Sequence, residues 1–223
     1  MSREPSTPLA PRRRAARTPM GVLLSGTGRT LENFVTLINA GQLPVTIPLV
    51  VSNRSDAYGL VRARSHGLPT RVIRPRDYPD DSAFSAAIAE AFRTAGAELI
   101  AMAGFLKLWH IPPDYRGRVL NVHPALLPSF CGLGFYGDRV HQAVFDSGVK
   151  VSGCTVHFAD EEYDHGPIIV QKTVAINDAD DPHTIADKVF ALECEAYPEA
   201  IRLFCEGRLV IEGRRVRVRL AMQ

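Results

Sequence analysis

The stretch "MGVLLSGTGRTLENFVTLINAG", residues 20–41, contains the pattern that sets the fold. Its first part, "MGVLLS", is a short, nearly continuous apolar run, which is typical of a strand buried on both faces of a sheet. Its last part, "RTLENFVTLINAG", has apolar residues at helical spacing and ends on Gly41, a residue type that often closes helices. The stretch therefore predicts a β-strand, a tight turn and an α-helix.

The same alternation repeats along the next hundred residues. Apolar runs occur in "TIPLVVSN", "TRVIR", "AELIAMAG" and "GRVLNVH", and helical spacing occurs in "AYGLVRARSHG" and "SAFSAAIAEAFRTAG", which close on Gly67 and Gly96. This βαβ pattern predicts an α/β fold with an open, mostly parallel, Rossmann-like sheet and helices on both faces. Ligands of such sheets bind at the carboxyl ends of the strands.

The C-terminal part reads differently, because two long strand-like runs follow each other directly. "DRVHQAVFDSG" predicts a helix, "VKVSGCTVHFAD" and "GPIIVQKTVAI" predict two strands joined by a turn, and "PHTIADKVFALECEAYPEAIRLFCEG" predicts a long final helix. Strands joined by a short turn pair antiparallel. We therefore expect this part to extend the same sheet in a partly antiparallel manner.

The positive charge is concentrated at the chain ends. The net charge is +2 over 223 residues, but residues 1–18 hold five Arg and one Glu, so the remainder is mildly acidic. These 18 residues include three prolines and show no periodicity, which predicts a disordered basic leader before a single domain at residues 19–223. The C-terminal "RRVRVRL" alternates Arg and Val and favours an edge strand over a nucleic-acid site. We expect no nucleic-acid partner.

Cysteine usage and hydropathy indicate the compartment. The four cysteines form no C-x-x-C pair, which favours reduced thiols in the cytoplasm, and no run approaches about 18 apolar residues, so no membrane partner is expected. His123, His157 and His165 could be imagined as metal ligands, but their spacing matches no metal motif. We expect no metal.

The turn after the first strand, "SGTGRTL" at residues 25–31, is suited to an anion. Its glycines let the backbone turn tightly, and the N–H groups of the following helix favour a phosphate at Gly28, Arg29 and Thr30. Two alternatives stay open. A nicotinamide dinucleotide would require glycine where Leu31 stands and an acidic residue where Asn53 ends the second strand. A plain strand-to-helix turn would also use glycine.

Two polar clusters suggest acid–base chemistry. In "NVHPALLPSF", residues 121–130, Asn121 and His123 share one side of a strand that Pro124 then stops, as either a satisfied polar edge or an active centre. In "DEEYDHGPI", residues 160–168, a sharp turn presents Asp164. A turn Asp is usually only structural, but a carboxylate near a His favours the imidazolium that a general acid requires.

In this order, the segments "SGTGRTL", "AGFLKLW", "NVHPALLPSF" and "DHGPII" resemble the folate-dependent formyltransferase superfamily, and within it the branch whose acceptor is glycinamide ribonucleotide. The likeness covers most of residues 20–212. It implies formyl transfer from 10-formyltetrahydrofolate to the amine of 5′-phosphoribosylglycinamide in de novo purine biosynthesis, with two small-molecule substrates and no metal. It also implies that Asn121 and His123 are catalytic donors to the formyl oxygen and that Asp164 orients and charges the His.

The resemblance extends to binding. It implies that Gly28, Arg29 and Thr30 hold the phosphate and that Glu193 contacts the ribonucleotide. It also implies that Leu106, Lys107, Leu108 and Trp109, together with Asn121, bind the folate. Taken alone, "AGFLKLW" is equally compatible with core packing.

The chain departs from the family pattern at two places. The loop "FCGLGFYGDRVHQAV" is longer and has Cys131 where proline is common, and "DYPDDSAFS" offers no counterpart of a folate-binding Arg. Two alternatives to the branch function are a formyl-folate enzyme with another acceptor or with water as acceptor, and a non-catalytic nucleotide-binding module. The sequence leaves a homodimer open.

Overall fold

The computed structural model describes residues 17–220, which form two compact units. The first unit contains Arg17–Val122 and Ala159–Tyr163, and the second contains His123–Phe158 and the chain from Asp164 onward. Residues 1–16 of the predicted leader lie outside the described residues, and the first strand begins at Thr18. That residues 19–223 act as a single domain stays a prediction.

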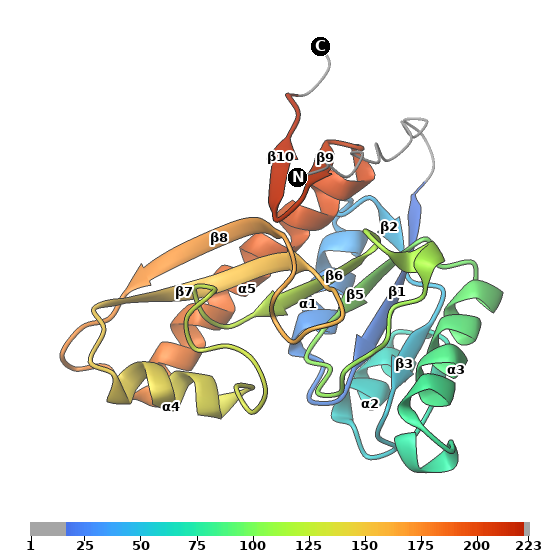
Figure 1. The fold of residues 1–223 in the computed structure, drawn as a ribbon, viewed down its shortest axis with the longest axis horizontal. Coiled ribbons are helices and arrows are strands. Elements are labelled where there is room, and N and C mark those ends of the chain that lie inside the picture. The colour runs from blue at the N-terminus through green and yellow to red at the C-terminus, as the bar shows by residue number, and fades with distance from the viewer. Residues whose placement is uncertain (1–16, 221–223) are drawn as a thin grey trace, which may run out of the picture. The chain divides into compact units, whose positions relative to one another are not determined.

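The first unit follows the predicted alternation of strands and helices (Figure 1). Its elements are β1 (Thr18–Leu24), α1 (Arg29–Asn39), β2 (Val45–Thr46), β3 (Val50–Ser52), α2 (Tyr58–Ser65), β4 (Thr70–Val72), α3 (Asp81–Thr94), β5 (Leu99–Met102) and β6 (Val119–His123), with short 3₁₀ turns at Pro75–Asp77 and Pro113–Tyr115. The last residue of β6, His123, belongs to the second unit. The predicted closing glycines Gly41, Gly67 and Gly96 follow α1, α2 and α3 with φ of 71°, 68° and 70°. This confirms the helix ends inferred from the sequence.

The strands of the first unit are parallel and run in the order β4-β3-β1-β5-β6, with β2 also beside β1. Leu23 in β1 pairs with Val51 of β3 on one side and with Met102 of β5 on the other. The chain therefore leaves β1 toward β3 and later returns to the opposite side at β5. Such a reversal of strand order creates a crevice at the carboxyl ends of the strands, here those of β1 and β5.

Helices cover both faces of this parallel sheet. On one face, α3 buries Phe84, Ile88 and Phe92 in the same apolar cluster as Leu23. On the other face, the next residue, Leu24, packs so closely against α2 that a Cβ at Gly59 would lie 2.8 Å from it. Neighbouring residues of a strand point to opposite faces, which explains how β1 contacts both helices.

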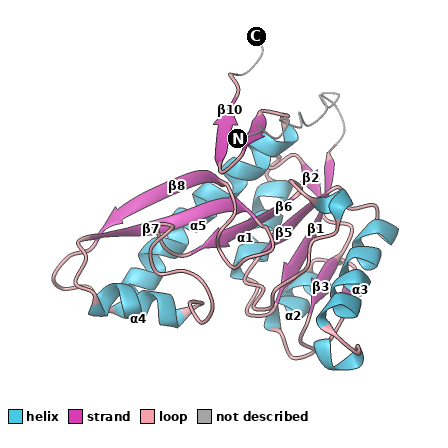
Figure 2. Cartoon of the chain, viewed as in Figure 1, coloured by secondary structure: helices cyan, strands magenta, loops and turns pink. Residues whose placement is uncertain are grey.

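The second unit contains the antiparallel part (Figure 2). Its elements are α4 (Asp138–Asp146), β7 (Val151–Phe158), β8 (Ile168–Ala175), α5 (Pro182–Cys205), β9 (Leu209–Glu212) and β10 (Arg215–Val218). β7 and β8 pair antiparallel with an irregularity between Val156 and His157, and α5 packs on both strands. β10 pairs antiparallel with β9 and joins β8 in parallel at Arg215 and Ile168. The predicted fold class, mostly parallel with a partly antiparallel C-terminal part, is confirmed.

Candidate active site

The glycine turn in the first unit is shaped by Gly28. Gly28 precedes α1 with φ 76° and ψ 23°, and no side chain caps this helix. A Cβ at Gly28 would lie 2.5 Å from the Cα atom of Gly59 in α2, so glycine is required here by packing as well as by backbone conformation. The first N–H groups of an α-helix have no acceptor within the helix, so the start of a helix favours an anion. Arg29 is exposed and Thr30 is half-buried at this end of α1.

Arg62 of α2 holds the glycine turn from outside. Its Nε donates to the Thr27 carbonyl at 3.1 Å and its Nη1 donates to Glu32 of α1 at 3.0 Å. His66 contacts the other oxygen of Glu32 at 2.8 Å. Hydrogen bonds from His66 and Arg62 lower the pKa of the Glu32 carboxyl, and the one from His66 has the larger effect. Sequence reasoning gave Arg62 no role, because nothing local links it to a turn so far away in the chain.

Ser25 connects the carboxyl ends of three strands. Its N–H donates to the Gly104 carbonyl at 3.0 Å, its Oγ donates to Oδ1 of Asn53 at 2.6 Å, and the same Oγ accepts from the Leu106 N–H at 3.0 Å. These bonds join the ends of β1, β3 and β5 where the strand order reverses. The predicted phosphate turn and the predicted folate segment are therefore held together where the strand order reverses, the place at which ligands of such sheets generally bind.

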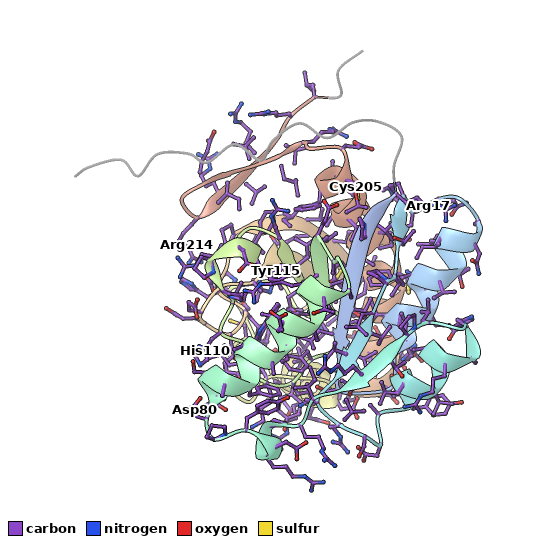
Figure 3. All side chains as sticks on the ribbon, turned by 90° about the vertical axis from the view of Figure 1, so that its right-hand side faces the viewer. Arg17, Asp80, His110, Tyr115, Cys205 and Arg214 are labelled. Carbon is purple, nitrogen blue, oxygen red and sulfur yellow. The ribbon has the colours of Figure 1, made fainter. Side chains whose placement is uncertain are left out.

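The folate segment divides into an exposed part and a buried part. Leu106 and Lys107 are exposed and Leu108 is half-buried. Trp109 is 1% exposed, donates its Nε1–H to the Ser85 carbonyl at 3.0 Å, and packs against Tyr115 with ring centroids 6.0 Å apart. Tyr115 is fixed in turn by a 2.9 Å hydrogen bond to the Ala97 carbonyl (Figure 3). The core-packing alternative thus holds for the Trp109 side chain, and Leu106 to Leu108 are the more exposed part of the segment.

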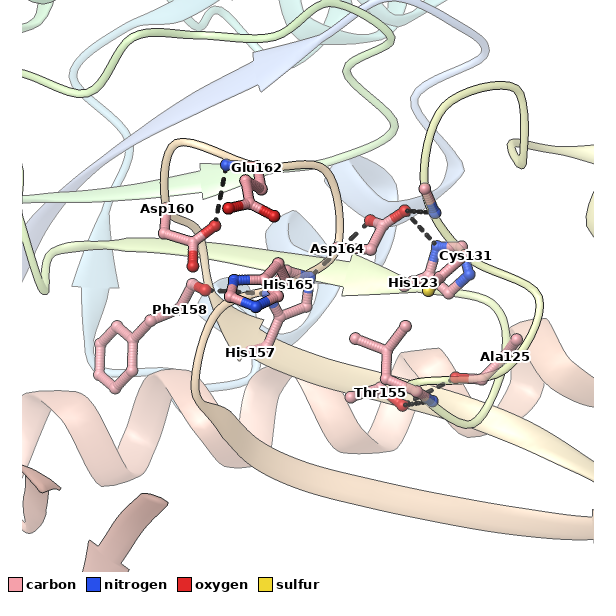
Figure 4. Close-up of polar contacts among 12 residues, drawn as sticks. His123, Ala125, Cys131, Thr155, His157, Phe158, Asp160, Glu162, Asp164 and His165 are labelled. Atoms are coloured by element: carbon pink, nitrogen blue, oxygen red, sulfur yellow. Dashed lines mark hydrogen bonds and ion pairs between the residues drawn. The ribbon is translucent and has the colours of Figure 1, made fainter. Parts of the chain in front are cut away.

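His123 ends β6 and is 3% exposed. Its Nδ1 lies 3.4 Å from Oδ2 of Asp164 (Figure 4). Its Nε2 lies 2.8 Å from the carbonyl oxygen of Phe130. A carbonyl and an ionised carboxylate only accept hydrogen bonds, so both ring nitrogens are placed to donate. This geometry suits the doubly protonated imidazolium. The sequence prediction that His123 and Asp164 lie together is confirmed as a contact.

Asp164 contacts a backbone amide and two imidazole rings. Its Oδ2 accepts the Gly132 N–H at 3.2 Å, its Oδ1 lies 3.9 Å from Nε2 of His157, and its side chain is 11% exposed. Burial by itself raises the pKa of Asp164, but the contacts with His123, the Gly132 amide and His157 outweigh burial and hold this pKa below its usual value. The carboxylate is therefore ionised at neutral pH.

His157 was missed as a partner of Asp164, because the sequence suggested only a metal role for it. It is 1% exposed in β7 and its Nδ1 donates to the Phe158 carbonyl at 2.9 Å. That bond leaves Nε2 facing the carboxylate. The available signal was a histidine inside the predicted strand "VKVSGCTVHFAD", since buried polar groups are nearly always paired.

The remaining predicted residues lie on regular elements. Asn121 is half-buried on β6 and pairs in register with Met102 of β5. Glu193 is half-buried on α5, where its charge acts on the Cys154 thiol, whose pKa is raised to about 12 mainly by burial. Both positions are compatible with the predicted roles, which stay predictions.

Residues 17–220 contain neither a metal-binding cluster nor a membrane-spanning helix. No group of three or more His, Cys, Asp or Glu side chains there is arranged to hold a metal ion. None of the helices in this range combines the length and the apolar character needed to cross a bilayer.

Comparison with known proteins identifies relatives of the chain. A profile of the formyl transferase family matches residues 20–201. The solved structure of glycinamide ribonucleotide transformylase 1 from Symbiobacterium toebii is 42% identical, with a TM-score of 0.86 over 91% of this chain and 94% of that one. Phosphoribosylglycinamide formyltransferase of Bacillus subtilis is 38% identical over 81% of this chain and 91% of its own length. The trifunctional purine biosynthetic protein adenosine-3 of Gallus gallus is 38% identical over 87% of this chain, which spans 19% of that protein.

Proposed function

The chain belongs to the formyl transferase family, and from this premise we propose that it transfers the formyl group of 10-formyltetrahydrofolate to the amine of phosphoribosylglycinamide. The Bacillus subtilis and Symbiobacterium toebii relatives that bear this name or its synonym support the choice of acceptor. The observation that carries the proposal is the imidazole of His123, which has a carboxylate on Nδ1 and a carbonyl oxygen on Nε2.

The chemistry requires donors for a developing oxyanion. The amine lone pair attacks the formyl carbon, a new C–N bond forms, and the carbonyl electrons move to oxygen. The bond to N10 of the folate then breaks, N10 takes a proton, and the attacking nitrogen loses one. We infer that the formyl oxygen takes the place of the Phe130 carbonyl at Nε2 of His123, where the ring already donates across 2.8 Å. Preorganised donors of this kind are worth on the order of 3 kcal/mol each.

Asn121 is the second donor in this proposal. It precedes His123 by two residues in β6, and alternate residues of a strand project to the same side. A carboxamide supplies N–H donors without a change of charge. The pair therefore combines a neutral donor and a cationic donor on one rigid element, which suits a group whose negative charge exists only in the intermediate.

Asp164 acts through His123. Its ionised carboxylate lies 3.4 Å from Nδ1 of the ring and fixes its orientation. The Gly132 amide and His157 keep the carboxylate itself in place. No residue becomes covalently formylated in this mechanism, because the amine attacks the formyl carbon directly.

The substrate contacts rest on the resemblance together with the position of each segment. The uncapped start of α1, with Gly28, Arg29 and Thr30, is proposed to bind the ribonucleotide phosphate. The segment Leu106–Leu108, in which Leu106 is exposed and Leu108 is half-buried, is proposed to line the folate pocket. For Trp109, which belongs to the core, only backbone contacts are proposed. Glu193 is proposed to attract the substrate amine.

The test is an assay of the purified protein with 10-formyltetrahydrofolate, with and without phosphoribosylglycinamide. Absorbance follows the deformylated folate, and mass spectrometry identifies the acceptor product, which gains one CO. Glycinamide riboside, which lacks the phosphate, serves as the matched control and is expected to react much more slowly at equal concentration. Equal folate turnover with no acceptor, together with release of formate, would replace the proposal with a hydrolase.

A further inference from the structure

The residue that follows Asp164 is held by the C-terminal hairpin. Arg214 lies in the turn between β9 and β10 (Figure 3) and donates from Nη2 to the backbone carbonyl of His165 at 2.9 Å. Its Nη1 lies against the imidazole ring of the same residue, 3.1 Å from Nδ1 and in contact with Nε2. One residue further on, Arg215 pairs with Ile168 at the start of β8. The hairpin therefore contacts the segment after Asp164 at two residues, His165 and Ile168.

The segment held by Arg214 begins with an uncommon backbone conformation. Asp164 has φ of 54°, in the left-handed region, which Asp adopts more readily than most other non-glycine residues. Within the second unit its side chain contacts Gly132 and His123, while the guanidinium of Arg214 holds the carbonyl of the next residue. In Figure 4 the side chain of Asp164 points toward His123, and that of His165 points away from this contact. The two neighbours are thus fixed by different partners.

The chemistry of the Arg214 contact is directional. A guanidinium has five N–H donors in a fixed plane, so it can bond a carbonyl with one nitrogen and approach a ring nitrogen with another. A hydrogen bond from a cation to a backbone carbonyl is stronger than one from a neutral donor. Lysine would keep the charge but could not span both acceptors with one planar group.

We propose that Arg214 is a positioning residue for formyl transfer, which fixes the backbone at His165 and thereby holds the Asp164 carboxylate against His123. It lies beyond the part of the chain that the family profile matches, so the profile gives it no role. The inference rests on the proposed function, because positioning is measured through turnover.

The experiment compares Arg214→Ala and Arg214→Lys with a control on the same hairpin, Arg217→Gln, whose guanidinium bonds Glu212 within the hairpin. We expect Arg214→Ala to lower kcat by about tenfold or more, since small displacements of catalytic groups have effects of this size. KM for both substrates should change less than about twofold. Arg214→Lys should be intermediate, and Arg217→Gln should match the unchanged protein.

Rescue separates positioning from a general loss of structure. Addition of tens of millimolar guanidinium should restore part of kcat to Arg214→Ala and none to Asp164→Asn. The inference is overturned if Arg214→Ala turns over like Arg217→Gln, or if it loses activity with a lower melting temperature and no rescue. If the unchanged protein transfers no formyl group, the proposed function fails first, and this outcome is distinct from failure of the Arg214 inference.

Discussion

Phe130 and Asp164 share a left-handed backbone and contact the same imidazole from its two nitrogens. Their φ values are 52° and 54°, and within residues 17–220 they are the two non-glycine residues with positive φ. The Phe130 carbonyl meets Nε2 of His123, and the Asp164 carboxylate meets Nδ1. Such conformations cost of order 1–3 kcal/mol each and cluster at functional sites, where the surrounding structure sustains them. Both residues with this unusual backbone conformation therefore contact His123.

The first prediction concerns the contact between His123 and Asp164. His123→Asn and Asp164→Asn should each lower kcat by at least about a hundredfold, because each removes charge that acts on the transition state. KM values should change much less. Steady-state kinetics with both substrates, together with thermal melting of each variant, checks this.

His183 provides the control for this pair. It is a histidine with an 86% exposed side chain at the start of α5, and His183→Asn should leave turnover unchanged. Turnover near that of the unchanged protein in either active-site variant would remove the proposed mechanism.

The second prediction follows from the lowered pKa of Asp164. A carboxyl whose pKa is depressed in the folded state stabilises the fold above its unfolded pKa, near 4, and this contribution is lost as pH falls through the lower folded value. The difference in free energy of unfolding between the unchanged protein and Asp164→Asn should shrink as pH falls below about 4. Urea unfolding at several pH values measures it, and a difference that grows with acidity would contradict the direction of the shift.

The third prediction separates the two glycines of the phosphate turn. Gly28→Ala should lower the melting temperature strongly, since its Cβ would lie 2.5 Å from the Gly59 backbone at a φ of 76°. Gly26→Ala should be tolerated, because no atom lies within 4 Å of its built Cβ. Differential scanning calorimetry of both variants checks this, and equal melting temperatures would show that the turn repacks.

The fourth prediction tests phosphate binding without disturbing this turn. Thr30→Val and Arg29→Ala remove polar groups at the start of α1, and each should raise KM for the ribonucleotide. We expect about tenfold for the pair combined, which corresponds to about 1.4 kcal/mol if KM tracks affinity. KM for the folate should remain nearly constant. A ribonucleotide KM that does not change would locate the phosphate elsewhere.

The fifth prediction concerns the buried hydroxyl that fixes the chain after His123. Thr155 Oγ1 donates to the Ala125 carbonyl at 2.7 Å and accepts from the Leu127 N–H at 3.1 Å and from Gln171 at 3.0 Å. Thr155→Val should lower the free energy of unfolding by about 1–3 kcal/mol, since it leaves buried groups unpaired. Thr173→Val, at an exposed position of β8, should stay within about 0.5 kcal/mol. Equal effects would mean that water replaces the hydroxyl.

The order and type of most elements could be predicted from the sequence. Apolar periodicity distinguishes buried strands from amphipathic helices, and Gly41, Gly67 and Gly96 mark helix ends because each has positive φ. The two-residue spacing of Asn121 and His123 predicted that both lie on one side of a strand. The resemblance identified Asp164 as the partner of His123. These are local signals, since periodicity and turn chemistry depend on neighbours in the chain.

The tertiary structure alone decided which distant polar groups meet. Ser25 bonds the amide of a residue 81 positions away, and Arg214 bonds His165 across 49 positions. Trp109 looked equally suited to a pocket and to the core, and only its packing against Phe92 and Tyr115 resolved this. The physical reason is that a polar side chain has many possible partners along a chain, and the choice among them depends on how strands and helices close around the core, which no local pattern specifies.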